Sequence, residues 1–261
     1  MVGLPQFLVV GAQKAGTTTL QALLGLHPDV FLPNPKEVHY FTLHYSEGLD
    51  WYKKHFNAAI NDQCIGEITP YYLFHPYAAE RINADLGCVR IIILLRDPIT
   101  RTISHYRHAC RLGFEKLALN EALADEPKRL KGSERILSLP NGRHFWHQEC
   151  SYISRSFYRN QVERYWNLFG RDRVLLLPSE ELFANPWHTL LKVFKFLDLQ
   201  TMPMPKDARL KVRANASPLS TEIDLPIAFR EYLRIQLDDS YEFAKDKIGW
   251  SKELGWVWDE Y

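Results

Sequence analysis

A loop bounded by two glycines, placed directly after a short apolar run, is the feature that most restricts the fold of this chain. The segment FLVVGAQKAGTT begins at Phe7 and carries its glycines at Gly11 and Gly16. This order predicts a strand, an anion-binding loop and a helix, because glycines allow successive N–H groups to converge on an anion at a helix N-terminus. The spacing is that of a nucleotide-binding P-loop. However, Thr17 stands where an ATPase or GTPase carries lysine, and the lysine of this loop is Lys14.

The length and composition favour one compact domain over residues 1–261. A chain of 261 residues, 46% of them hydrophobic, can bury a substantial α/β core. Its 15 prolines are spread along the chain, with no repeat or low-complexity tract. The 32 basic residues nearly balance the 31 acidic ones, so the chain has no net field that would attract nucleic acid or an anionic membrane. Any site for a polyanion must therefore be local.

The sequence favours a soluble, cytoplasmic protein. The first apolar run, at Phe7, is too short and too early to be a signal peptide or a membrane span. The alternative is the excised catalytic domain of a larger or membrane-anchored protein. Four widely spaced cysteines make no metal-binding pattern and are expected to be reduced, with two disulfides as the less favoured alternative; they are Cys64, Cys88, Cys110 and Cys150. The sequence does not indicate an oligomeric state.

Apolar runs alternate with amphipathic segments along the chain. A five-residue strand is predicted at Phe7, and further strands at 64–69, 89–95 and 174–177, with a short apolar piece at 30–32. Helices are predicted after the glycine loop, then from Ile99 to Cys110 with Ile99, Ile103, Tyr106 and Cys110 as its apolar stripe, and over 157–169 and 187–197. This alternation predicts a three-layer α/β fold with a central parallel sheet, whose ligands bind beyond the carboxyl ends of the strands. Residues 112–150 are polar and irregular, and no element is assigned to them.

Five sequence blocks resemble the sulfotransferases that use 3′-phosphoadenosine 5′-phosphosulfate (PAPS), in particular the heparan-sulfate-type and related bacterial enzymes. These blocks are GAQKAGTT, KEVHYF, GEITPYYL, RDPITRTISHY, and the run from SRSFYRNQVERY to ELFANPWHTLLKVFKFLDL. The resemblance implies a P-loop-like fold, PAPS as donor, 3′-phosphoadenosine 5′-phosphate (PAP) as product, and no metal. A P-loop nucleoside triphosphatase is the alternative. It would need a GK[ST] ending and an acidic strand end for Mg²⁺, and neither is present in the expected form.

The resemblance also implies which residues bind the donor. It assigns to the 5′-phosphosulfate the loop residues Gln13, Lys14, Ala15, Gly16, Thr17 and Thr18. Lys14 suits this role because a lysine within the loop can neutralise charge on the departing phosphate. Arg96 and Ser104 match the pair that holds the 3′-phosphate; their alternative is a surface pair of Arg96 with Asp97 and a serine that faces its own helix. Arg213 lies in a weakly matching basic segment, and it is the last donor residue that the resemblance implies.

Glu37 matches the general base that the family is proposed to use on the acceptor hydroxyl. His39 is the alternative base or an acceptor contact, and on an extended segment residues two apart would point to the same side. The competing interpretation is an exposed ion pair of Lys36 with Glu37. Heparan-type members often carry a second lysine in the GEITP block, where this chain has Ile68. Lys14 is therefore the only lysine that the resemblance places at the leaving group, unless a residue from elsewhere compensates.

The resulting prediction is a sulfotransferase that moves a sulfuryl group from PAPS to an acceptor hydroxyl by in-line transfer, with Glu37 as base. Two alternatives are N-sulfation of an amine and a binding module for phosphonucleotides without turnover. The acceptor is expected to be a glycan, a lipid or a carrier-bound acyl chain. Residues 112–150 are expected to form an acceptor-side insertion or lid, because insertions between core elements usually form binding loops. Its candidate acceptor contacts are Arg143, His144, Trp146 and His147.

Overall fold

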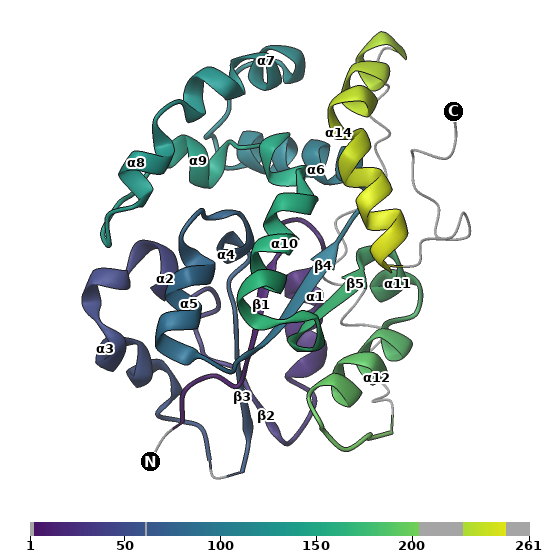
Figure 1. Ribbon diagram of the computed structural model, residues 1–261. Helices are drawn as coiled ribbons and strands as arrows, with labels where there is room; N and C mark the ends of the chain where they lie inside the picture. Colours follow the sequence, from purple (N-terminus) through teal and green to yellow (C-terminus); the bar gives the residue numbers. More distant parts are fainter. Residues whose placement is uncertain (1–2, 61, 204–226, 249–261) are drawn as a thin grey trace.

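A five-stranded parallel sheet forms the centre of the computed structural model, which describes residues 3–60, 62–203 and 227–248 (Figure 1). The strand order is β2-β3-β1-β4-β5. The strands are β1 (Phe7–Gly11), β2 (Val30–Phe31), β3 (Cys64–Ile68), β4 (Arg90–Leu95) and β5 (Val174–Pro178). All paired strands run parallel, with Leu8 of β1 opposite Glu67 and Ile91. The predicted α/β class is confirmed, and the short apolar piece at 30–32 supplies the edge strand β2.

Helices cover both faces of the sheet and its carboxyl edge (Figure 1). In the first half of the chain they are α1 (Thr17–Leu24), α2 (Tyr40–Leu43), α3 (Leu49–Lys53), α4 (Tyr71–Phe74), α5 (Ala78–Leu86) and α6 (Pro98–Arg111). In the second half they are α7 (Leu119–Leu130), α8 (Ser133–Leu137), α9 (Phe145–Glu149), α10 (Tyr158–Phe169), α11 (Ser179–Ala184), α12 (Pro186–Phe196) and α14 (Ile227–Ile248). Short 3₁₀ turns are η1 (Tyr45–Glu47), η2 (Lys54–Phe56), η3 (Ser154–Ser156) and η4 (Arg171–Arg173).

The two middle strands are the most deeply buried elements. The side chains of Phe7–Val10 in β1 and of Ile91–Leu95 in β4 are wholly buried. Both strands are covered on two faces, which explains why their sequences read as unbroken apolar runs. This rigid centre places the loops that follow β1, β3 and β4 at one edge of the molecule.

Helix α6 buries a different face from the predicted one. Ile99 is buried, but Ile103 and Tyr106 are only partly buried. The most deeply buried side chains of this helix include Arg101 and His105. The reason is that the Arg101 guanidinium donates to Ser156 Oγ at 2.5 Å and to the Tyr152 carbonyl of the neighbouring η3 region. A buried hydrogen-bond network, rather than apolar packing alone, therefore orients the helix.

The segment 112–150, predicted to be irregular, contains the three helices α7, α8 and α9. They lie together on the side of the carboxyl ends of the strands (Figure 1). The buried face of α7 consists of Ala122, Leu123 and the acidic Glu126, so its apolar periodicity is weak. Pro127 also lies inside the helix and speaks against helix when the sequence is read alone. The prediction of an irregular segment was wrong for these reasons.

Candidate active site

The loop between β1 and α1 has the glycine-dependent backbone that its sequence predicted, and Lys14 adds a strained position that was not predicted. Gly16 has φ of 94°, and a Cβ there would lie 3.1 Å from side-chain atoms of Leu182 and Phe183. Lys14 also occupies the left-handed region, with φ of 71°. Gly11 is needed for another reason, because a Cβ there would lie 2.6 Å from Leu73 Cβ. Gly16 is the residue that precedes α1 and has no side chain to cap it, so the first N–H groups of α1 face the loop.

Arg96 holds this loop from the end of β4. Its Nη1 donates to the Lys14 carbonyl at 2.9 Å, and its own carbonyl accepts from Tyr158 Oη at 2.7 Å. Asp97 is engaged elsewhere, since its Oδ1 accepts from the N–H of Thr100 and caps α6. The surface pair of Arg96 with Asp97 is therefore not what this strand end forms. Ser104 lies in the second turn of α6 and is partly buried.

Positive charge is concentrated around Lys14. Burial, and then the charges of Arg111 and Arg96, lower the pKa of Lys14 to about 8. Crowding of cations costs free energy in the empty site and is relieved when an anion binds between them. The side chain of Gln13, which was predicted to bind the anion, instead accepts a hydrogen bond from the buried Arg155 through its Oε1 at 2.5 Å. The loop thus has the electrostatic character of a site for a polyanionic ligand.

Glu37 and His39 form a contact, although their segment is not extended. Both have positive φ, 63° and 57°, and Glu37 Oε2 lies 3.5 Å from His39 Nε2. Lys36 Nζ lies 3.0 Å from Glu37 Oε1. Burial acts to raise the pKa of Glu37, but the contacts with His39 and Lys36 outweigh it and lower that pKa to about 2. The two side chains share one site by way of left-handed backbone, not through the predicted two-residue alternation.

Two groups that hold His39 were missed by sequence reasoning. His39 Nδ1 lies 3.2 Å from Thr42 Oγ1, and the His39 N–H donates to Thr69 Oγ1 at 3.5 Å. Thr69 in turn donates to the wholly buried Glu67, which also accepts from Tyr52 at 3.0 Å. Glu67 is therefore a structural carboxylate that supports the candidate base segment, and burial raises its pKa. The block GEITP carried the signal, since it places a charged residue inside a buried strand.

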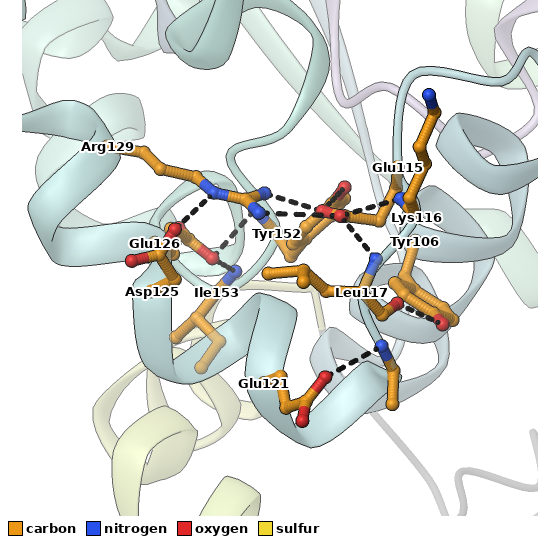
Figure 2. A network of polar contacts seen from close by, with 11 residues as sticks. Tyr106, Glu115, Lys116, Leu117, Glu121, Asp125, Glu126, Arg129, Tyr152 and Ile153 are labelled. Carbon is orange, nitrogen blue, oxygen red and sulfur yellow. Dashed lines mark hydrogen bonds and ion pairs between the residues drawn. The ribbon is translucent and has the colours of Figure 1, made fainter.

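Buried carboxylates fasten the 112–150 insertion to the segment that follows it (Figure 2). Glu126 accepts from the backbone N–H groups of Tyr152, Ile153 and Ser154 at 2.8–2.9 Å. Figure 2 also shows Arg129 between two acids, with Nη1 2.5 Å from Glu115 and Nε 2.7 Å from Asp125. The segment that Glu126 holds leads into Arg155, which binds Gln13 of the loop. The insertion is thus connected to the glycine loop by buried polar contacts.

The four predicted acceptor contacts differ in exposure. His147 is buried, with Nδ1 2.8 Å from Tyr71 Oη and its ring 4.3 Å from that of Phe74. Trp146 is half-buried, with the Arg129 guanidinium 4.3 Å from its ring centroid. These two side chains pack within the protein. His144 caps α9, whereas Arg143 is exposed and donates to the Leu43 carbonyl.

Several other predicted positions are placed as follows. Thr17 is buried and Thr18 is exposed at the start of α1, and Ala15 is buried in the loop. Ile68 lies in the core, 2% exposed. Arg213 lies outside the described residues. The four cysteines are free thiols, as predicted.

The described part of the chain was also searched for metal sites and membrane spans. It contains no cluster of three or more histidine, cysteine, aspartate or glutamate side chains that could hold a metal ion. Among the helices that the structure describes, none has the length and apolar character needed to cross a bilayer.

Comparisons with known proteins show which family and which solved structures this chain is similar to. A family model described as "Sulfotransferase domain" matches residues 4–217. The membrane-associated sulfotransferase kil1 of Dictyostelium discoideum is 42% identical over 106 residues, which are 40% of this chain and 22% of that protein. Human heparan sulfate glucosamine 3-O-sulfotransferase 6 is 29% identical over 202 residues, 77% of this chain and 54% of its own length. The chain therefore spans about half the length of that relative.

Solved structures show the same fold. A sulfotransferase from Alicyclobacillus acidocaldarius superposes with a TM-score of 0.77 at 27% identity, and the match covers 96% of this chain and 98% of that one. A mouse sulfotransferase complexed with PAP matches with a TM-score of 0.53 at 16% identity, over 98% of this chain and 89% of that chain. The second likeness concerns the fold alone.

Proposed function

The chain belongs to the sulfotransferase domain family, and from this premise we propose that it transfers a sulfuryl group from PAPS to an acceptor hydroxyl, with Glu37 as general base. The observation that carries the proposal is the position of Lys14. Lys14 has a left-handed backbone, and Arg96 holds its carbonyl. The charges that act on Lys14 include that of Lys36, which pairs with the ionised Glu37 of the base segment. Sulfuryl transfer needs a polyanion site next to a proton acceptor, and these residues provide both.

The residues around the loop fit a phosphosulfate. A donor at this site supplies an activated sulfuryl group on a good leaving phosphate. The N-terminus of α1 and Lys14 would bind its 5′ end, and Arg96 with Ser104 its 3′-phosphate. Lys14 would neutralise charge that grows on the oxygen left behind as the sulfur–oxygen bond breaks. PAP as product follows from this assignment, and the step as written needs no metal.

Glu37 would accept the acceptor's hydroxyl proton as that oxygen attacks sulfur. The contacts with Lys36 and His39 lower the pKa of Glu37, so its carboxylate is ionised at neutral pH and has a free oxygen lone pair for the proton. His39, held by Thr42 and the Thr69 hydroxyl, would orient the carboxylate. Positioning and electrostatics are then the main sources of catalysis.

We propose a glycan, lipid or carrier-bound acyl hydroxyl as acceptor, and the name of the heparan sulfate relative favours a glycan. The insertion supplies the surface for it, since its exposed side chains include Phe114 and Phe145, whose rings are 5.3 Å apart. Aromatic rings bind both sugars and apolar chains. A cytoplasmic location stays a prediction.

Two measurements test the donor and the reaction. In calorimetry, PAP should bind about ten-fold to a hundred-fold more tightly than ADP, because ADP lacks the 3′-phosphate that Arg96 and Ser104 would bind with charge-assisted hydrogen bonds. A sulfate-transfer screen with PAPS over glycan, lipid and acyl-carrier acceptors, read by product mass, identifies the acceptor. Equal affinities for PAP and ADP would contradict the donor assignment. Tight PAP binding without transfer to any acceptor would favour the binding module.

A further inference from the structure

Lys36 joins the glycine loop to the candidate base. Its side chain is 20% exposed, and its Nζ lies 2.9 Å from Thr18 Oγ1 and 3.0 Å from Glu37 Oε1. Thr18 is the second residue of α1, eighteen positions earlier in the chain. One ammonium group therefore bridges the N-terminus of α1 and the carboxylate of the base segment.

The contact with Thr18 goes beyond an ordinary ion pair of neighbours. An ion pair with Glu37 does not by itself require Lys36 Nζ to lie within hydrogen-bond distance of α1, yet it does so at Thr18. Through Thr18, Lys36 lies at the helix end where the exposed N–H groups favour an anion. Its charge is also one of those that lower the pKa of Lys14, so the two ammonium groups lie within electrostatic reach of each other.

We propose that Lys36 is a second donor-binding cation, which contacts the 5′-phosphosulfate beside Thr18 while it remains next to Glu37. This inference rests on the proposed function. It supplies the compensating cation that the apolar Ile68 cannot provide, because Ile68 lies in the core. Lys14 then contacts the leaving group from the loop, and Lys36 from the side of the base.

The position of Lys36 matches the movement of charge during transfer. The acceptor oxygen forms a bond to sulfur as its proton passes to Glu37, and the sulfur–oxygen bond breaks with its electron pair left on the phosphate. Glu37 thus loses its negative charge while the phosphate oxygen gains one. A cation between the two groups interacts more strongly with the leaving group in the transition state than in the ground state, which is the condition for catalysis.

The decisive experiment compares two ligands that differ only at the 5′ end. PAP and adenosine 3′-monophosphate are titrated by calorimetry into wild type, Lys36→Met and Lys36→Arg. Lys36→Met should weaken PAP binding about ten-fold and change the affinity for the monophosphate less than two-fold, since one charge-assisted contact is lost. Lys36→Arg retains the charge and should keep PAP affinity within a few-fold.

Lys53→Met is the matched control. Lys53 also pairs with a nearby acid, with Nζ 3.1 Å from Asp50, but it lies in α3 away from the loop. It should bind both ligands as wild type does. Far-UV circular dichroism and thermal midpoints of all variants establish that they fold.

A second measurement reads Glu37 by ¹³C NMR of its carboxyl group. Lys36→Met should raise the titration midpoint of Glu37, because burial is then opposed by fewer favourable contacts. The other ionisable groups that act on Glu37 are His39, His108 on α6, Glu149 on α9 and Arg155 in η3. They are unchanged in the variant.

The outcomes separate this inference from the proposed function. Suppose that wild type prefers PAP to ADP. If Lys36→Met then weakens the binding of PAP and of adenosine 3′-monophosphate equally, or changes neither affinity, Lys36 does not contact the 5′ end and the inference is wrong. A raised Glu37 midpoint with unchanged PAP affinity would confine Lys36 to the base and overturn it as well. If wild type itself shows no preference for PAP, the proposed function fails first, and the role of Lys36 at the donor fails with it.

Discussion

Glu37 and His39 are two candidate site residues whose side chains are brought together by an unusual backbone conformation. Both are non-glycine residues with positive φ, a conformation that costs about 1–3 kcal/mol each and persists only where surrounding contacts enforce it. The enforcing contacts are those of His39 with Thr69 and Thr42 and of Glu37 with Lys36. The sequence motif KEVHYF identified these residues but did not predict this backbone.

Replacement of Glu37 by glutamine tests whether its carboxylate is the base. Glu37→Gln should lower the rate of sulfuryl transfer by about 10²–10⁴-fold, the usual range for a general base, and leave PAP affinity almost unchanged. Transfer is followed by product mass and binding by calorimetry. His39→Ala serves as the comparison. If Glu37→Gln stays active and His39→Ala does not, the histidine is the base.

Lys14 should matter more for the transition state than for donor binding. Lys14→Ala is expected to lower kcat by the equivalent of about 2–4 kcal/mol, the range for one transition-state donor, with a smaller change in donor affinity. Near-normal kcat with raised KM would show that Lys14 only anchors the donor.

The pH dependence of PAP binding checks the same side chain. The lowered pKa of about 8 means that Lys14 loses its charge above pH 8 in the empty protein. Bound phosphate favours the charged form, so PAP affinity should fall as the pH rises from 7 to 9. This loss should be reduced in Lys14→Ala.

At the scale of elements, apolar runs predicted the sheet and the extent of α6, but not the buried face of α6 and not the helix α7. The strands β1 and β4 are buried on both faces, so every residue in them carries the signal. Helices α6 and α7 bury Arg101 and Glu126, whose hydrogen-bond partners are far away in the sequence. No local pattern reveals such partners. The contact of Lys36 with Thr18 was equally invisible, since it joins separate elements.

Glu126 should be a major anchor of the insertion. Glu126→Ala leaves the three N–H groups of 152–154 without their acceptor and should lower the free energy of unfolding by at least about 3 kcal/mol, since each buried unpaired group costs about 1–3 kcal/mol. Urea denaturation measures the loss. Glu121→Ala in the same helix is the control, because Glu121 is exposed and accepts only the Ala118 N–H at the helix start, so its loss should cost about 1 kcal/mol. Equal losses in the two variants would contradict the anchoring role.

At the scale of the whole molecule, the carboxyl edge of the sheet gathers residues that are far apart in the sequence. Four segments meet there, namely the loop after β1, residues 36–39, the end of β4 and η3. Their contacts include Arg96 with Lys14, Lys36 with Thr18 and Arg155 with Gln13. The general location of this site was predictable from topology, whereas the side-chain contacts were not. A ligand that contacts several of these segments should therefore raise the unfolding temperature of the whole described domain in a single transition.

Thermal unfolding with PAP tests whether the chain unfolds in one transition, as the single-domain prediction requires. At a hundred times its dissociation constant, PAP should stabilise the folded protein by about 2.7 kcal/mol. Circular dichroism and tryptophan fluorescence should report one transition that shifts upward together. ADP at the same concentration should shift it less. Two separate transitions, with only one moved by PAP, would indicate two domains.

The inward-facing anchors of the insertion have a consequence for protein engineering. Glu126, Arg129 and Glu115 fasten the helices from within, whereas Phe114 and Phe145 project outward and are 36% and 48% exposed. The buried scaffold and the proposed acceptor surface are thus formed by different residues of one segment. Libraries that randomise only the outer positions would explore new acceptors without dismantling the fold. On the proposed function, the buried residues of this segment would keep the fold constant while its outer residues set the acceptor.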